Sequence, residues 1–139
     1  MSNLFYPAFK ERLLRAYFLG ESPTGDVAVQ VVLVGPAFNY SENHDSLDQV
    51  NGVLTDPVTI TGAELNGGFF TGDDLVPAWD NLTLGQTVKG LLIFAAYEEA
   101  GDVLTELICY VDTSRDGSLP LTVSYEALNL RWDEFIFQL

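Results

Sequence analysis

The sequence has little of what most protein chemistry requires. Its 139 residues include one cysteine and one histidine, and 6 lysines and arginines stand against 20 aspartates and glutamates. A single cysteine cannot form an internal disulfide, and one histidine with one cysteine cannot complete a tetrahedral zinc site. A protein that neutralises ~6–10 phosphates needs that many clustered basic groups. We therefore expect no internal disulfide, no zinc site and no direct binding of nucleic acid.

Long apolar runs are also missing. The longest uninterrupted apolar stretch is residues 91–97, which as a helix would span only ~10 Å of a ~30 Å hydrocarbon layer. Residues 1–9 have neither a basic start nor a long apolar segment, so no secretory signal is predicted. The net charge is −14, and this charge opposes binding to an anionic lipid surface. We expect no interaction with membranes.

The rest of the composition is that of a folded protein. Hydrophobic residues make up 47% of the chain and aromatic residues 12%, enough for one domain that buries roughly 68–70% of the surface of its unfolded chain. We expect residues 1–139 to form that single domain. The charge is unevenly placed. Residues 1–19 contain three basic residues and one acidic residue, a balance of +2, whereas the other residues contain three basic and nineteen acidic ones, a balance of −16.

An α-helix is predicted near the N-terminus. Pro7 suits the first turn of a helix, and Gly20 suits the left-handed residue that follows one. Between them, apolar residues recur on one helical face: Phe9, Leu13, Ala16 and Tyr17. Such a face has two interpretations. Either the helix packs on the chain's own sheet, or it is an arm that lies on a partner.

After this helix the sequence predicts strands and turns. Residues 27–34 are almost all apolar and β-branched, which indicates a strand covered on both faces. Two hairpins are predicted later, one from residues 87–97 and 103–112 and one from residues 128–132 and 135–137. The second should bury Trp132. The spacing of these signals predicts a mainly β fold, an antiparallel β-sandwich or barrel with one N-terminal α-helix. Residues 1–20 would form a helical arm and residues 26–139 the β-sandwich body.

Residues that could carry catalysis are few and isolated. His44 lies beside Asp45, but no Gly-x-Ser-x-Gly motif supplies a nucleophile. Three adjacent acidic pairs fall at predicted turns, where neighbouring carboxylates project to opposite sides: Asp73-Asp74, Glu98-Glu99 and Asp133-Glu134. No glycine-rich phosphate loop is present. We therefore predict that the protein is not an enzyme and has no catalytic residue, cofactor or metal.

Several short motifs, spread in order over nearly the whole chain, resemble those of a known family. The most specific is Tyr40-x-x-x-His44-Asp45-x-Leu47-Asp48-x-Val50. It is followed by Gly68-Phe69-Phe70-x-Gly72-Asp73-Asp74 and by the ending Leu128-Asn129-Leu130-Arg131-Trp132-Asp133. Together they resemble a family of small virion structural proteins of tailed bacteriophages, of the head decoration, or cement, type. None of these motifs is a catalytic signature.

This resemblance implies a non-enzymatic protein that binds the outside of the major capsid shell and stabilises it. It implies the capsid exterior as the location, after synthesis in the cytoplasm of the host bacterium. The implied partners are the major capsid protein and other copies of the chain, with a trimer favoured. Two alternatives stay open. One is a structural component of the phage tail or neck, and the other is a carbohydrate-binding β-sandwich that uses Trp79 and Tyr40 as a platform.

The N-terminal segment is the predicted contact with a partner subunit, because it combines aromatic and basic residues in an otherwise acidic chain. The predicted partner-binding residues are Phe5, Tyr6, Phe9, Lys10 and Arg12. Aromatic side chains would supply the anchors of such an interface, and the basic ones would steer the encounter. If this segment is an arm, deletion of residues 1–19 should leave a folded β body that no longer assembles.

Overall fold

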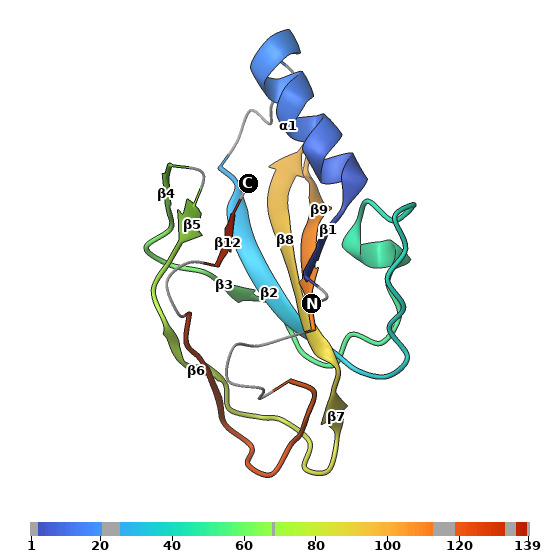
Figure 1. Cartoon of the computed structure of the whole chain (residues 1–139), viewed down its shortest axis with the longest axis vertical. Helices are drawn as coiled ribbons and strands as arrows, with labels where there is room; N and C mark the ends of the chain where they lie inside the picture. Colours follow the sequence, from blue (N-terminus) through green and yellow to red (C-terminus); the bar gives the residue numbers. More distant parts are fainter. Residues whose placement is uncertain (1–2, 21–25, 68, 113–118, 133–135, 139) are drawn as a thin grey trace.

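The computed structural model describes residues 3–20, 26–67, 69–112, 119–132 and 136–138. In this part of the chain strands predominate, all paired antiparallel, and the one α-helix, α1 (Pro7–Leu19), lies near the N-terminus (Figure 1). The predicted mainly β fold with one N-terminal helix is confirmed. Pro7 occupies the first turn of α1, and Gly20 follows the helix with a φ of 68° and donates its N–H to the carbonyl of Arg15. Pro7 and Gly20 therefore begin and end the helix as the sequence predicts.

The largest sheet has five strands in the order β1-β9-β8-β2-β3. These strands are β1 (Asn3–Phe5), β9 (Asp102–Val111), β8 (Gly90–Glu99), β2 (Ala28–Val34) and β3 (Val58–Thr59). The β8–β9 hairpin, which the sequence predicts, turns through Ala100 and Gly101, with φ values of 53° and 85°. Positive φ at both central residues matches the right-handed twist of the flanking strands. As described, the sheet is open, with β1 and β3 at its edges.

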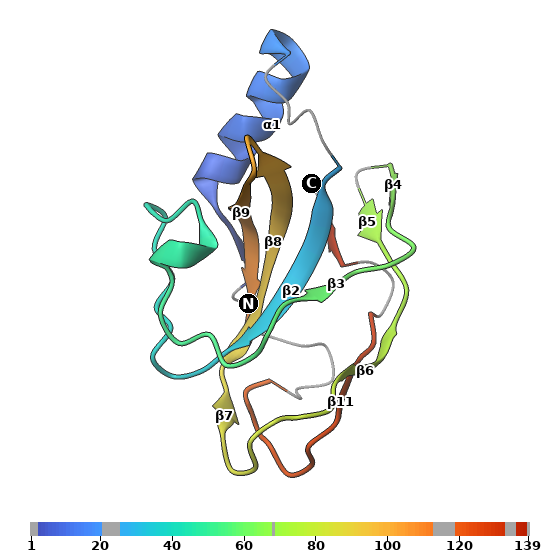
Figure 2. The ribbon, with the colours of Figure 1, turned by 180° about the vertical axis from the view of Figure 1, so that it is seen from behind.

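The remaining strands form three small antiparallel sheets. One has the order β12-β5-β4, the second pairs β11 with β6, and the third pairs β10 with β7. Their bounds are β4 (Glu64–Asn66), β5 (Phe69–Thr71), β6 (Leu75–Trp79), β7 (Thr87–Val88), β10 (Leu121–Thr122), β11 (Leu128–Leu130) and β12 (Phe137–Gln138). A short 3-10 helix, η1 (Leu47–Gln49), lies in the long connection between β2 and β3. Figure 2 shows this connection on one side of the large sheet and β4, β5 and β6 on the other.

Both faces of the large sheet are buried. In β2, Val31 and Leu33 belong to one cluster of buried apolar residues, whereas Val32 and Val34 belong to another. Because neighbouring residues of a strand point to opposite faces, the near-continuous apolar run of β2 supplies both clusters. The prediction of a strand covered on both faces at residues 27–34 is confirmed for β2.

The first core cluster packs the large sheet against the small ones. Its buried members from outside the large sheet are Ile60, Leu75, Trp79, Leu82, Val88, Val123 and Leu130. The second core cluster lies on the opposite face, where Tyr6 and Phe38 are its buried members from outside the strands. Tyr40, Leu47 and Val50 pack against this cluster from the same connection as η1. The motif from Tyr40 to Val50 therefore serves as a cover for one face of the sheet.

The end of the chain pairs differently from the prediction. β11 pairs with β6, and β12 pairs with β5, so the two segments do not form a hairpin with each other. Trp132 is half-buried, not buried, and its backbone N–H donates to Asp74 Oδ1 at 2.8 Å. Its indole N–H donates to the carbonyl of Asp73 at 2.9 Å. Residue Phe135, where the second strand of the predicted hairpin begins, lies outside the described residues.

The N-terminal segment is part of the body. β1 pairs with β9, and the backbone N–H of Tyr6 donates to the carbonyl of Ile108 at 3.0 Å. Ile108 is the extra residue of a β-bulge in β9, where Phe94 pairs with Leu107 and Ile93 with Cys109. The Tyr6 side chain is 0% exposed. Strand pairing and burial therefore tie the start of the N-terminal segment, up to Tyr6, to the sheet.

Two buried tyrosines predict an alkaline limit to stability. The hydroxyls of Tyr6 and Tyr110 find no hydrogen-bond partner among the described residues. Burial, together with the nearby charge of Asp112, raises the pKa of Tyr110 from 10.0 to about 12, and burial raises the pKa of Tyr6 as well. Since the folded pKa is raised, the neutral phenols favour the folded state below pH 10, and this contribution falls as the pH rises towards 12.

Replacement of Tyr110 by phenylalanine should therefore reduce the loss of stability above pH 10. One fewer proton is released on unfolding, which lowers the slope of the unfolding free energy by up to about 1.4 kcal/mol per pH unit. At pH 7, Tyr110→Phe should be close to neutral because it removes a hydroxyl without a partner. Urea unfolding between pH 7 and pH 11.5 measures both effects. The exposed Tyr125 provides the control, Tyr125→Phe, and equal alkaline slopes for the two variants would contradict the prediction.

Candidate functional site

The predicted partner-binding residues mostly hold the N-terminal segment on the body. Tyr6 is enclosed in the single chain, and the partner contact of the N-terminal segment stays a prediction. Phe5 and Phe9 are partly buried against the core clusters. Arg12 Nε lies 3.0 Å from Glu106 Oε1 in β9. Lys10 is exposed, with its Nζ 5.8 Å from the centroid of the Phe5 ring. The five residues lie close together in the fold, but chiefly as an internal attachment.

The second half of α1 has a different environment. Four apolar residues there are strongly exposed, and we call them the apolar end of α1: Leu14 (59%), Tyr17 (83%), Phe18 (72%) and Leu19 (63%). The Tyr17 and Phe18 rings meet edge to face, with centroids 4.9 Å apart. Figures 1 and 2 both show this half of the helix extending past the ends of β8 and β9. Two such aromatic side chains expose roughly 300 Å², which is the scale of a functional patch.

Sequence reasoning missed this patch because it assigned Tyr17 to the face that packs. A signal was present, however. With 3.6 residues per turn, Leu13, Leu14, Phe18 and Leu19 spread around more than half of the helix circumference. Apolar residues spread so widely cannot all contact a single sheet. The two earlier interpretations of α1 each describe one half of it: Phe9 packs on the body, and the apolar end does not.

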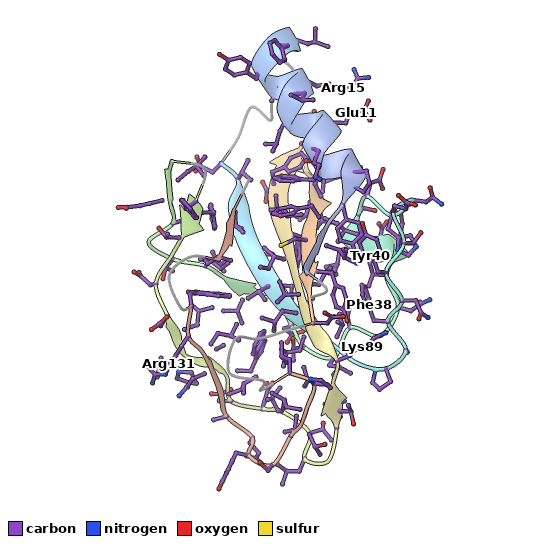
Figure 3. The ribbon with its side chains drawn as sticks, viewed as in Figure 1. Glu11, Arg15, Phe38, Tyr40, Lys89 and Arg131 are labelled. Carbon is purple, nitrogen blue, oxygen red and sulfur yellow. The ribbon has the colours of Figure 1, made fainter. Side chains whose placement is uncertain are left out.

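An ion pair, Arg12–Glu106, joins α1 to β9. The Glu106 carboxylate forms the ion pair with Arg12 described above and accepts a hydrogen bond of 2.9 Å from the Tyr97 hydroxyl. One turn further along, Arg15 Nε donates to Glu11 Oε1 at 3.2 Å (Figure 3). Such exposed pairs add only about 0.3–0.5 kcal/mol each. Their effect is to place the basic side chains along the helix, next to its apolar end.

The end of the β8–β9 hairpin carries the opposite charge. We call residues 98–104 the hairpin tip. It exposes three carboxylates, those of Glu98, Glu99 and Asp102, and two apolar residues, Val103 (67%) and Leu104 (38%). The tip lies at the same end of the molecule as α1 (Figure 1). One end of the molecule therefore has two exposed apolar surfaces, α1 with basic side chains and the hairpin tip with acidic ones.

His44 and Cys109 are the described residues whose side chains could most readily support catalysis. His44 Nδ1 is buried without a hydrogen-bond partner among the described residues, and its backbone N–H donates to the carbonyl of Ser41. Burial raises the pKa of Cys109 to about 12, which disfavours a reactive thiolate. Within the described ranges, no group of three or more histidine, cysteine, aspartate or glutamate side chains is placed to hold a metal ion. Nor does any helix there have the length and apolar character needed to cross a membrane.

The acidic pair Asp73-Asp74 has a structural role. The backbone N–H of Asp73 donates to the carbonyl of Thr61, and the Thr61 hydroxyl donates to Asp73 Oδ2 at 3.3 Å. Asp74 accepts the backbone N–H of Trp132, as described above. The two carboxylates thus join three segments of the fold. This arrangement explains the pair without assigning it any substrate.

The two residues proposed as a carbohydrate platform, Trp79 and Tyr40, both make contacts inside the chain. Trp79 is buried in the first core cluster, and its indole N–H donates to the carbonyl of Asp56 at 2.9 Å. The Tyr40 hydroxyl donates to the carbonyl of Phe5 at 2.8 Å, and its ring lies 4.9 Å from that of Tyr6. Trp79 therefore offers no exposed face of the kind that stacks on a sugar, and Tyr40 is half-buried. The expectation that Trp79 and Tyr40 form such a platform is therefore wrong.

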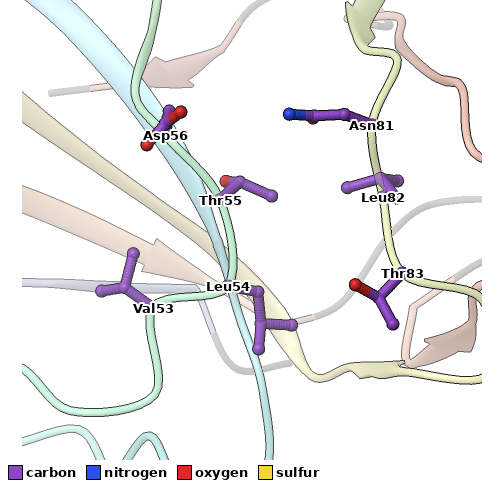
Figure 4. A pocket seen from close by; sticks show the side chains of 7 residues that line it. All are labelled: Val53, Leu54, Thr55, Asp56, Asn81, Leu82 and Thr83. Carbon is purple, nitrogen blue, oxygen red and sulfur yellow. The ribbon is translucent and has the colours of Figure 1, made fainter.

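Two surface pockets are lined by described residues. The first, of about 280 Å³, lies between two loop segments whose side chains face each other in Figure 4. Its lining residues are Val53, Leu54, Thr55, Asp56, Asn81, Leu82 and Thr83. The second, of about 290 Å³, lies between the first half of α1 and β9, beside Arg12 and Glu106. Both pockets are at the lower limit of the size of ligand sites.

Comparison of the chain with protein-family models, with curated proteins and with solved structures found no match in any of the three.

Proposed function

We propose that this chain is a non-enzymatic structural protein of a tailed-phage virion, and that it decorates the outside of the major capsid shell as a cement protein. The apolar end of α1 carries the proposal, because it presents an adhesive element on a folded and strongly acidic body. The resemblance of the motifs between Tyr40 and Asp133 supports the same role. The partner is then the major capsid protein, and the location is the capsid exterior after synthesis in the host cytoplasm.

The physical requirements of a cement protein agree with these features. Such a protein stabilises a shell by contacting several subunits at once, so it needs adhesive surfaces and no reacting group. Apolar anchors supply most of the affinity of an interface, and complementary charge increases the rate of association. A balance of −16 over the residues after 19 keeps the outward surface hydrated and opposes non-specific association.

Binding to capsid shells tests the proposal directly. Purified protein is added to mature shells that lack it, and the bound copies per shell are measured as its concentration rises. We expect saturation at hundreds of copies, in a fixed ratio to the capsid subunits, and a higher melting temperature of the shell. Shells that already carry their full complement are the control and should bind none.

Two other results would contradict the proposal. If the protein does not bind shells but occurs in intact virions at a few to a few tens of copies, it belongs to the tail or neck. If it binds polysaccharides of the host surface and not shells, it is a carbohydrate-binding protein. In that case a surface other than Trp79 and Tyr40 must supply the contact, since both of these residues make internal contacts.

A further inference from the structure

The apolar end of α1 is too exposed to be explained by the folding of one chain. No residue of this 13-residue helix is buried. A helix of about that length is marginal in water without tertiary support, and here the support comes from its first half, through Phe9 and Arg12. Tyr17 and Phe18 add exposed apolar surface that contributes nothing to the stability of the single chain. Burial of these rings therefore requires a second surface.

The hairpin tip has the properties that such a surface needs. Its exposed apolar residues, Val103 and Leu104, can pack against aromatic rings, and the surrounding carboxylates match the basic side chains of Lys10 and Arg15. In one chain the tip and the apolar end of α1 are both exposed, so neither covers the other. A second copy brings the two together without changing either.

We propose that the apolar end of α1 docks on the hairpin tip of a second copy of this chain. The contact is head to tail, because a helix-to-helix contact would place two segments of charge +2 against each other. Both surfaces lie at one end of the molecule (Figure 1), so successive contacts can close into a ring around one axis. This inference rests on the proposed function in one respect, which is that linked copies would give a cement protein several contacts with the shell.

The mass of the full chain in solution is the first test. Sedimentation equilibrium should give a whole-number multiple, two or more, of the 15.3 kDa of one chain. The double variant Tyr17→Ser/Phe18→Ser should raise the dissociation constant at least about 30-fold, as expected for the loss of interface hot spots. Tyr125→Ser, which changes a tyrosine that is 79% exposed, is the matched control and should assemble normally. A monomeric wild-type protein, or an assembly unaffected by the double variant, would overturn the inference.

Cysteine pairs identify which surfaces meet. One tagged chain carries Phe18→Cys and a second carries Val103→Cys, and the two are co-expressed and oxidised. Because each chain has one introduced thiol, a mixed disulfide can only join two copies, and the native Cys109 is buried. We expect a mixed disulfide for this pair and none for Phe18→Cys with Tyr125→Cys. A disulfide between two Phe18→Cys chains would place helix against helix and overturn the head-to-tail contact.

Charge reversal tests the electrostatic part. Glu98→Arg/Glu99→Arg should weaken assembly, and addition of Arg15→Glu in the same chain should restore part of it. If the triple variant assembles no better than the double variant, these charges do not face each other. All three tests use the purified protein without shells. A monomer that still binds shells would overturn this inference alone, whereas a ring that binds no shell would overturn only the proposed function.

Discussion

Deletion of residues 1–19 should abolish cooperative folding instead of releasing a stable β body. The deletion removes β1 from the edge of the five-stranded sheet and takes the enclosed Tyr6 out of the second core cluster. Loss of one large buried aromatic side chain costs about 3–5 kcal/mol, and the packing of Phe5 and Phe9 is lost as well. The sum is comparable to the whole stability of a small domain, about 5–15 kcal/mol. Circular dichroism during heating should show no cooperative transition.

This expectation replaces the one that follows from an independent arm. The variant Tyr17→Ser/Phe18→Ser separates the two roles of the N-terminal segment, because both changed side chains are exposed. It should unfold cooperatively, within about 1 kcal/mol of the unmodified chain. A deletion variant that melts cooperatively at a similar temperature would show that β1 and Tyr6 are dispensable, and the attachment described above would then be wrong.

Replacement of Trp79 by alanine should be the most damaging single substitution in β6. Its side chain is 5% exposed and lies among Leu75, Leu82 and Leu130 in the first core cluster. Removal of a buried indole leaves a cavity and costs about 3–5 kcal/mol, and the Asp56 carbonyl also loses its donor. Urea unfolding at pH 7 measures the change in the unfolding free energy.

Two further variants separate the causes of this loss. Trp79→Phe keeps most of the apolar volume but removes the hydrogen bond, so its cost should be clearly smaller than that of Trp79→Ala. Trp132→Ala is the comparison at a half-buried position. Less apolar contact is lost there, and a cost of about 1–3 kcal/mol is expected. Equal costs for the two alanine variants would refute the difference in burial between the two tryptophans.

Local signals account for the elements that sequence reasoning predicted correctly. Pro7 and Gly20 mark the ends of α1 because each has a backbone preference that suits its position. The β8–β9 hairpin follows from two long apolar strands around Ala100-Gly101. The double burial of β2 follows from its continuous apolar run, since both faces of such a strand must be covered. None of these inferences needs to know which strand lies beside which.

The errors all concern contacts between distant segments. Strand pairing of β12 with β5 is set by packing that neighbouring residues do not encode. Tryptophan is a residue type that often serves in binding sites, but Trp79 is buried in the core. The burial of Tyr6 in the single chain was missed for the same reason, because whether an aromatic side chain is covered depends on segments distant in the sequence.

The amino-acid sequence alone was sufficient for the mainly β class, the single helix and the excess of negative charge, because these depend on composition and on short-range backbone preferences. The position of α1 was decided by tertiary structure. The pairing of β1 and the burial of Tyr6 fix the start of the helix on the sheet. The second half of the helix extends past the ends of β8 and β9. The spread of apolar residues around the helix indicates that some of them stay uncovered, but the exposure of Tyr17 and Phe18 in particular depends on where the helix is attached to the sheet.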